Sequence, residues 1–191
     1  MGESLNLFFL LVISMKPTSF SPVKLIFGII ASDNRVFKRG EGSLKKLFGP
    51  LDAESQKWPF MFTDYYQKEM GKDLFRKFLS FEKLIKPECL ADIKLTSNDM
   101  EEKISHEFQS KSRIINLDPG YLTTAALFMA TTKNFASRVP LQKGIYAHLE
   151  LMFGKNEVRL LDWTYPDFRN TGYQKYFLKI RAIYLEQLCC F

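Results

Sequence analysis

The stretch VKLIFGIIA, residues 23–31, decides the fold. Its β-branched and apolar residues run without interruption between Pro22 and the polar group Ser32-Asp33-Asn34. A short apolar run bounded in this way predicts a buried β-strand. The remaining elements are predicted outward from this strand.

The segment after this strand predicts a short helix and then two paired strands. The helix is expected over residues 43–48, because Gly49 and Pro50 form a stop signal behind it. Residues 58–65 and 74–81 alternate apolar and polar side chains on either side of a polar stretch. We expect these two runs to pair antiparallel.

Residues 87–108 predict a second helix, because apolar side chains recur there at helical spacing with acidic residues between them. A break is expected near Ser97 and Asn98. Residues 113–117 (RIINL) then predict a strand that runs into Asp118-Pro119-Gly120.

The role of Asp118 depends on one ambiguous segment, residues 121–133, which are apolar at both the helical and the strand period. The alanines within this segment favour a helix. On that interpretation Asp118 caps the helix, and Lys133 lies about 20 Å away in a separate site. If the segment is instead a strand hairpinned against its neighbours, other groups could approach Asp118.

The last third of the chain predicts three strands and a closing helix. Residues 138–141, 145–153 and 158–163 are separated by turn residues, as is typical of a meander. An apolar stripe over residues 173–188 predicts the helix. The order indicates a single α+β domain over residues 15–191, with a ferredoxin-like β-α-β-β-α-β core followed by the meander and the C-terminal helix.

Residues 1–14 are expected to be an N-terminal extension or a gene-start error. The apolar run at 5–13 has neither a basic region before it nor a small-residue cleavage site after it. It is also shorter than the roughly 20 apolar residues that a spanning helix needs. Met15 offers a start just upstream of the first strand. We expect no membrane association.

Composition narrows the class of protein. The 191 residues are 46% hydrophobic and 15% aromatic, which is enough for a sizeable core. The net charge is +6, but 21 acidic residues are interleaved with 27 basic ones, so specific nucleic-acid binding is not expected. Three cysteines and two histidines show no metal-binding spacing. We predict no metal site, assign no cofactor, and expect a reducing, cytoplasmic location.

Six blocks of the sequence carry a resemblance to a known family. They are FMFTDYYQKEMG (60–71), FEKLIKPECLAD (81–92), NLDPGYL (116–122), ATTKNFASR (130–138), GIYA (144–147) and WTYPDFR (163–169). Together they resemble the bacterial family called domain of unknown function 4416, whose name assigns no activity. That family tends to carry Glu after GIYA, where this chain has His148.

Some relatives in that family carry a loose label of GTP binding. A phosphate-cradling loop needs the spacing GxxxxGK[ST] between a strand and a helix, and the sequence has no such string. Residues 39–45 (RGEGSLK) have the wrong spacing and are typical of a flexible turn. A P-loop GTPase is not expected.

The candidates for acid–base chemistry are Asp64, Glu69 and Asp118. Asp64, Tyr66 and Glu69 lie at the end of a predicted strand, where side chains can leave the core and converge on a ligand. Acidic residues in such places more often cap turns or face water.

The candidates for ligand binding are Lys133, Arg138, Lys94 and Tyr66. The three cations could hold phosphate, although a lysine near the end of a helix also complements the helix dipole. On the helical interpretation of residues 121–133, we expect Lys133 and Arg138 to meet the strand-end residues in one cleft. The aromatic block Trp163, Tyr165 and Pro166 is expected in the core.

Two functions remain open. The preferred one is a binder, or an enzyme, of a phosphorylated small molecule or nucleotide. The alternative is a non-catalytic protein–protein interaction domain. Convergence of the acidic and basic candidates in one cleft would favour the first, and their dispersal would favour the second.

Overall fold

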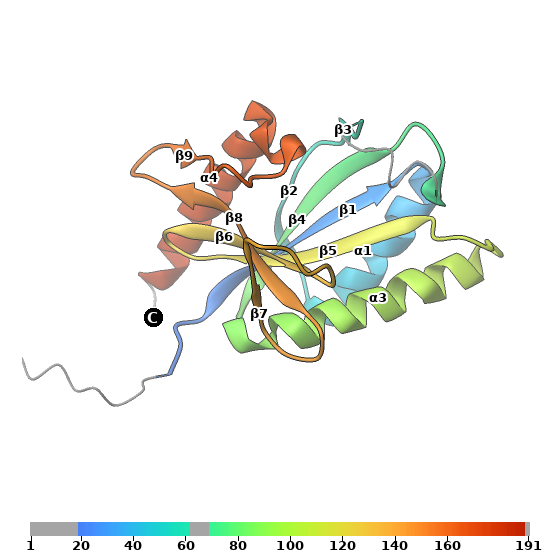
Figure 1. Ribbon diagram of the computed structural model, residues 1–191, viewed down its shortest axis with the longest axis horizontal. Coiled ribbons are helices and arrows are strands. Elements are labelled where there is room, and N and C mark those ends of the chain that lie inside the picture. Colours follow the sequence, from blue (N-terminus) through green and yellow to red (C-terminus); the bar gives the residue numbers. More distant parts are fainter. Residues whose placement is uncertain (1–18, 62–68, 190–191) are drawn as a thin grey trace, which may run out of the picture.

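The computed structural model of the chain describes residues 19–61 and 69–189 (Figure 1). In chain order its elements are β1 (Val23–Ala31), α1 (Asn34–Phe48), β2 (Leu51–Glu54), β3 (Trp58–Pro59), β4 (Phe75–Ile85), η1 (Pro87–Cys89), α3 (Leu90–Glu107), β5 (Ile115–Leu122), β6 (Ala126–Thr131), β7 (Arg138–Pro140), β8 (Tyr146–Phe153), β9 (Val158–Arg159), η2 (Pro166–Arg169) and α4 (Thr171–Leu188). The strands form one nine-stranded sheet, which confirms the α+β class.

Strand β1 lies where the sequence predicts it, and all nine of its residues are buried. It pairs antiparallel with β4 on one side and with β5 on the other. Because β2 pairs antiparallel with the far edge of β4, β1 and β2 run parallel with β4 between them. A β1–α1–β2 crossover split by an antiparallel strand is the arrangement of the predicted ferredoxin-like core.

The sheet extends beyond this core on the β5 side, where β6, β8 and β7 follow in that order. β7 and β9 both pair antiparallel with β8, as the predicted meander requires. Strand β9 ends at Arg159, earlier than predicted. The chain turns away after it, and the Trp163 indole N–H donates to the carbonyl of Leu149 at 2.9 Å.

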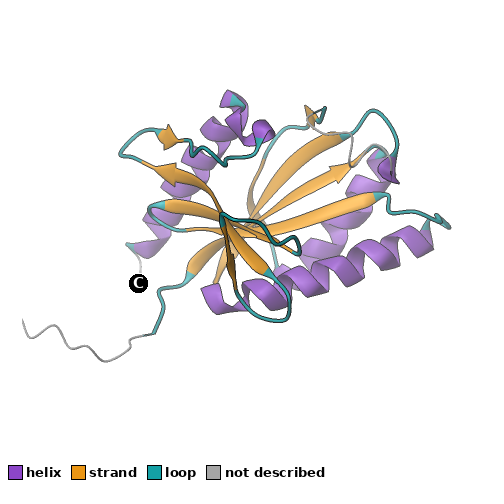
Figure 2. Cartoon of the chain, viewed as in Figure 1, coloured by secondary structure: helices purple, strands orange, loops and turns teal. Residues whose placement is uncertain are grey.

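The helices cover both faces of the sheet (Figure 2). Phe27 and Ile29 of β1 pack with α1 and α3, whereas Ile26 packs with α4. Successive side chains of a strand point to opposite faces. Helix α4 therefore lies on the face opposite to α1 and α3.

Helix α1 is longer than predicted and begins at Asn34, where the Asp33 side chain accepts a hydrogen bond from the Arg35 amide at 2.6 Å. The glycines within it suggested a loop. Gly40 is needed there because a Cβ at this position would lie 2.5 Å from Ile115 Cδ1, so the helix can approach the sheet closely. The prediction of a helix limited to residues 43–48 is wrong for that reason.

The predicted break in α3 near Ser97 and Asn98 is also wrong, because α3 is continuous from Leu90 to Glu107. Strand β2, a four-residue strand that pairs with β4, was not predicted. The predicted pairing of the Trp58 region with the next strand is present but short, since only Trp58 and Pro59 pair with β4 in the described residues.

The helix predicted for residues 121–133 is wrong, because these residues form the end of β5 and the strand β6. Thr123 closes the turn, and its hydroxyl accepts from the Ala126 amide at 2.9 Å. Ala130 is buried against Leu90 of α3, so burial between sheet and helix outweighs the intrinsic helix preference of alanine.

Strands β5 and β6 pair only from Gly120 to Leu122, so no strand of the described residues lies beside the first half of β5 on the β6 side. Side chains of α3 form hydrogen bonds with the β5 backbone at that edge instead. The Leu117 amide donates to Glu101 at 2.6 Å, and the Leu117 carbonyl accepts from Ser97 at 3.1 Å. Pro119, two residues on, needs no partner for an amide hydrogen, as is usual for proline at a sheet edge. This separation of β5 from β6 opens the sheet above Asp118.

Several predictions fall outside the described residues, namely the extension at 1–14, Asp64 and Tyr66. Cys89 and Cys189 are free thiols. Within the described ranges, no helix is long and apolar enough to cross a membrane.

Candidate functional site

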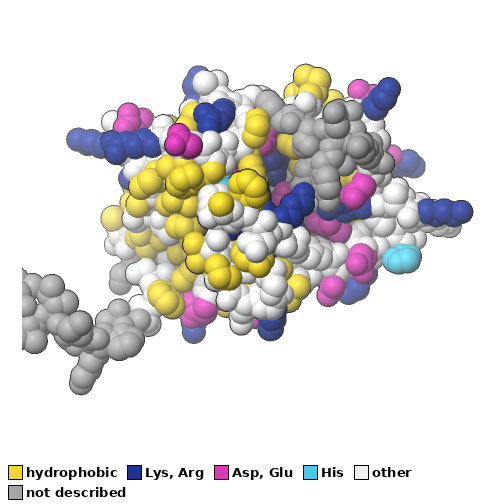
Figure 3. Space-filling view, in the orientation of Figure 1, with side chains coloured by type: hydrophobic (Ala, Val, Ile, Leu, Met, Phe, Trp, Pro, Cys, Tyr) yellow, Lys and Arg dark blue, Asp and Glu magenta, His cyan; other side chains and the backbone are white. Residues whose placement is uncertain are grey.

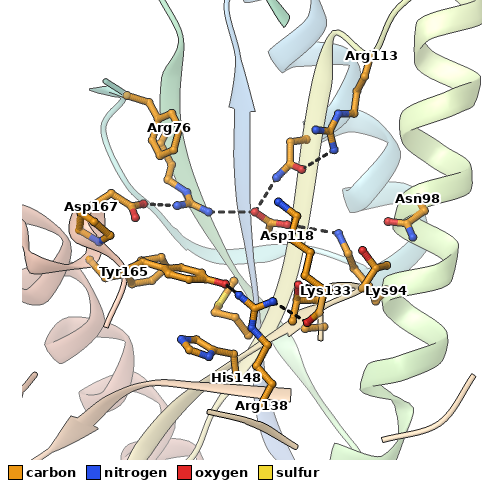
Figure 4. A pocket seen from close by; sticks show the side chains of 18 residues that line it. Arg76, Lys94, Asn98, Arg113, Asp118, Lys133, Arg138, His148, Tyr165 and Asp167 are labelled. Carbon is orange, nitrogen blue, oxygen red and sulfur yellow. Dashed lines mark hydrogen bonds and ion pairs between the residues drawn. The ribbon is translucent and has the colours of Figure 1, made fainter. Parts of the chain in front are cut away.

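A cavity of about 340 Å³ lies where β5 and β6 separate (Figure 4). Its walls come from β4, β5, β6, β7, β8, α3 and the segment that leads into η2. The cationic side chains that line it are Arg76, Lys94, Arg113, Lys133 and Arg138, and the carboxylates are Asp118 and Asp167. Among the described residues that line the cavity, cationic side chains outnumber carboxylates.

Arg76 of β4 is the most buried of these cations, at 4% exposed. Its guanidinium forms ion pairs with Asp167 of η2 and, at 3.1 Å, with Asp118 of β5. The aromatic ring of Phe168 lies 5.1 Å from the same guanidinium. Arg76 thus joins the core sheet to η2 across the floor of the cavity.

Gly28 of β1 makes room for that guanidinium. It stands between Phe78 and Asp118 in the sheet register. A Cβ at this position would lie 3.3 Å from Nε and Nη2 of Arg76. The absence of a side chain lets Arg76 lie flat over β1.

Asp118 lies at the centre of the cavity wall. Its carboxylate accepts from the Asn116 amide at 2.6 Å and pairs with Lys94 of α3 at 3.3 Å. Burial opposes its ionisation, but the adjacent Lys94 and Arg76 hold the pKa of Asp118 below its ordinary value. The carboxyl is therefore ionised at neutral pH and is suited to positioning rather than to donating a proton.

Arg113 forms the α3 end of the cavity. It donates to Asn116 at 3.1 Å and to Glu69 at 2.7 Å, and it lies 3.6 Å from Glu101. Burial raises the pKa of Glu101 to about 7, against the opposing effect of Lys94. The hydrogen bond from the Leu117 amide to Glu101, which supports the edge of β5, is therefore sensitive to pH near neutrality.

Lys133 and Arg138 lie on the side of the cavity formed by β6 and β7. Arg138 donates to the carbonyl of Lys133 at 2.6 Å and to the hydroxyl of Tyr165. Both acceptors are neutral, and no carboxylate of the described residues pairs with Arg138. Its charge is available to a ligand.

His148 of β8 faces the same side as Arg138 and Met129, its partners across the neighbouring strands. Its ring is 2% exposed and stacks on Tyr165, with centroids 4.8 Å apart. Nε2 lies 3.2 Å from Oε2 of Glu150, a fully buried carboxylate. Burial raises the pKa of Glu150, and the nearby His148 opposes that rise.

The cavity has the donors and the charge to bind an oxyanion. Guanidinium and ammonium groups converge on it, and such groups form the stronger hydrogen bonds to phosphate and carboxylate. Within the described residues, no group of three or more His, Cys, Asp or Glu side chains could hold a metal ion.

The structure brings together four of the residues predicted from the sequence, Asp118, Lys94, Lys133 and Arg138. The assignment of Asp118 to a separate site as a helix cap is wrong, because the helix is replaced by a strand hairpin. Glu69 is exposed and reaches the cavity only through Arg113. Asp64 and Tyr66 lie outside the described residues.

The sequence did not point to Arg76, Arg113 or Asp167. Arg76 has the alternating position of a solvent-facing residue in its strand, but Asp167 and Phe168 of η2 pack against its guanidinium. The core prediction for the aromatic block is wrong for Trp163, which is 42% exposed, and Tyr165 lines the cavity.

Comparison with known proteins gives one match. A family model described as Domain of unknown function (DUF4416) matches residues 21–184. No curated protein and no solved structure matches the chain.

Proposed function

We propose that this chain, which belongs to the family of domain of unknown function 4416, binds a phosphorylated small molecule or nucleotide in the cavity between β5 and β6. One observation carries the proposal. Among the described residues, five cationic and two carboxylate side chains line a cavity of about 340 Å³. The buried cations Arg76 and Lys94 pair with these carboxylates, whereas Arg138 is half-buried and has only neutral acceptors among the described residues.

The volume of the cavity and the side chains that line it suit a small ligand. Pockets for small molecules usually have volumes of about 300–1,000 Å³ and combine apolar walls with a few polar groups. Met129, Phe168 and Tyr165 supply apolar and aromatic surface beside the cations. The uncharged part of a ligand can pack there while its phosphate faces Arg138.

Arg138 is the cation that a phosphate would engage most directly. Its present acceptors are a carbonyl and a hydroxyl, so an incoming phosphate would gain a charge-assisted hydrogen bond without displacing a carboxylate. Arg76, by contrast, already pairs with two carboxylates. We expect Arg76 to shape the cavity and Arg138 to bind the ligand.

A thermal-shift screen tests this function. Inorganic phosphate, pyrophosphate, nucleotides and sugar phosphates are added separately, since a ligand that binds only the folded protein raises the melting temperature. At least one phosphorylated compound should raise the melting temperature, and Arg138→Gln should weaken the binding of that compound about tenfold or more. Arg159→Gln is the matched control, because Arg159 is an exposed arginine paired with Glu157. Equal weakening by both variants, or no shift with any compound, would contradict the proposal.

The second candidate function, a non-catalytic interaction domain, is favoured by exposed apolar side chains. Several of them come from residues 135–163, where Phe135 is 67% and Val139 is 63% exposed. Figure 3 shows hydrophobic side chains gathered over the β6 and β8 side of the molecule. If this function is correct, Val139→Lys should abolish binding to a partner protein and leave every ligand-induced thermal shift unchanged. The cytoplasmic location stays a prediction from the cysteine content.

A further inference from the structure

Asn98 of α3 lines the cavity and is half-buried there. It lies one helical turn beyond Lys94, so the two side chains project from the same face of α3, on the α3 side of Asp118 (Figure 4). No other described residue forms a hydrogen bond with its carboxamide. Because this group carries two donor hydrogens and an acceptor oxygen, it is suited to bind a polar group of a ligand.

Asp118, on the neighbouring wall, can accept a further hydrogen bond. Its donors among the described residues are Arg76, Lys94 and Asn116. A carboxylate has about four lone-pair sites, and the side chain of Asp118 keeps 19% exposure where it lines the cavity. The part of a ligand that faces Asp118 must therefore donate a hydrogen bond, since an acceptor there would remove water from the carboxylate without replacing it.

The cations beside Asp118 make a neutral donor the suitable one. Arg76 and Lys94 lie 3.1 Å and 3.3 Å from its two carboxylate oxygens. A third positive charge at this place would be repelled by both of them. A hydroxyl group fits the site, because it can donate to Asp118 and also accept a hydrogen bond from Asn98.

Two aromatic rings of the cavity favour a sugar over a nucleobase as the source of these hydroxyls. The ring of Tyr165 stacks on His148, with centroids 4.8 Å apart, and the ring of Phe168 stacks on Phe177 at 5.7 Å. The Arg76 guanidinium lies 5.1 Å from the Phe168 ring as well. Proteins commonly hold a nucleobase by stacking it on an aromatic side chain, and these two rings already have stacking partners.

We propose that the ligand of the cavity is a sugar phosphate, whose phosphate binds Arg138 and whose hydroxyl groups bind Asp118 and Asn98. The inference rests on the proposed function and names the class of compound within it. The phosphate and the sugar engage different walls, since Arg138 belongs to β7 and Asn98 to α3. Asn98 is thus a specificity-determining residue for the sugar.

Calorimetric titration of the wild-type protein tests the inference. Ribose 5-phosphate, glucose 6-phosphate and fructose 6-phosphate are compared with butyl phosphate, which is a phosphate monoester without a hydroxyl group on its carbon chain. At least one sugar phosphate should bind about tenfold or more tightly than butyl phosphate, because a hydroxyl that donates to Asp118 forms a charge-assisted hydrogen bond.

Asn98→Ala separates the sugar from the phosphate. It should weaken the binding of that sugar phosphate about two- to tenfold and leave butyl phosphate unchanged, whereas Arg138→Gln should weaken both. The variant should fold, because alanine suits the interior of a helix better than asparagine does. Asn156→Ala is the matched control and should change neither compound, because Asn156 is an exposed asparagine in the turn between β8 and β9.

Equal binding of butyl phosphate and all three sugar phosphates would overturn the inference and leave the proposed function standing. The same holds if Asn98→Ala weakens both kinds of compound alike or neither of them. A nucleotide that binds more than about tenfold tighter than ribose 5-phosphate would also overturn it, because the base would then dominate recognition. Failure of every phosphorylated compound to bind would overturn the proposed function itself.

Discussion

Lys24 and Arg76 are both buried cations on the α4 face of the sheet, yet their surroundings differ. Lys24 of β1 is 0% exposed and its ammonium group is enclosed by Asp52 and by Gln187 of α4, whose Oε1 lies 2.7 Å away. Arg76 is bonded to Asp118 and Asp167, but it opens onto a cavity that four further cationic side chains of the described residues line. The first site is closed and balanced in charge, and the second is open and has an excess of positive charge.

The comparison teaches how a structural ion pair differs from a ligand site on the same surface. In the closed site, the polar contacts of Lys24 link β1 to Asp52 of β2 and to Gln187 of α4. In the open site, Arg76, Asp118 and Asp167 shape a wall beside Arg138, whose acceptors among the described residues are both neutral. The predictions that follow test this distinction, from the largest expected effect to the smallest.

The largest expected effect is that of Arg76→Met. The change leaves Asp167, whose side chain is 5% exposed, without its guanidinium partner. Removing one member of a buried ion pair costs about 3–5 kcal/mol. Urea denaturation should show a loss of that size in the free energy of unfolding. A loss below about 1 kcal/mol would mean that water, and not the protein, holds these carboxylates.

Lys24→Met should cost somewhat less, about 3 kcal/mol, because the partner Asp52 retains 14% exposure and can be hydrated. The double variant with Asp52→Asn should recover much of the loss, since a closed and balanced pair can be replaced by neutral residues. Neither variant should change a ligand-induced thermal shift. A change in that shift would break the distinction between the two sites.

The pH dependence of Glu101 sharpens the comparison, because Glu101 supports the cavity edge of β5. Its pKa in the folded protein is about 7, above the usual 4.5, so the folded state binds the extra proton. Relative to Glu101→Gln, stability should fall by about 2–3 kcal/mol as the pH rises from 5 to 8. Parallel urea denaturation of the two proteins at both pH values measures this difference. An identical pH response would contradict the burial of Glu101.

The smallest expected effect is that of Gly28→Ala, about 1 kcal/mol. The new Cβ would lie 3.2 Å from the Phe78 ring and 3.3 Å from the Arg76 guanidinium, and the side chains can move slightly. Thermal denaturation should detect the loss. The matched control is Gly42→Ala on α1, where a Cβ meets nothing within 4 Å. A larger loss at Gly42 would contradict the close packing of Arg76 over β1.

The sheet core was predictable from the sequence because it depends on local patterns. The apolar run of β1 and the helical stripe of α4 each specify a buried element by their own periodicity. The hairpin over residues 121–131 was not predictable in this way, since its residues suit both periods and only the packing of α3 against Ala130 selects the strand.

The candidate site was predictable only in part, for a similar reason. Asp118, Lys133 and Arg138 were identified as polar residues in distinctive blocks, and Lys94 as a further lysine that could hold phosphate. Their convergence depends on the separation of β5 from β6, which no local pattern encodes. Arg76 and Asp167 are 91 residues apart in the chain, and a pair of that kind leaves no signal in the sequence of either segment.

Crystals of the protein soaked in selenate would test the central claim most directly, because selenium scatters anomalously and selenate resembles sulfate and phosphate in shape and charge. The account predicts an anomalous peak inside the cavity, with selenate oxygens at hydrogen-bond distance, about 2.7–3.2 Å, from the Arg138 guanidinium. Peaks only at exposed cations such as Arg159, with none in the cavity, would contradict it.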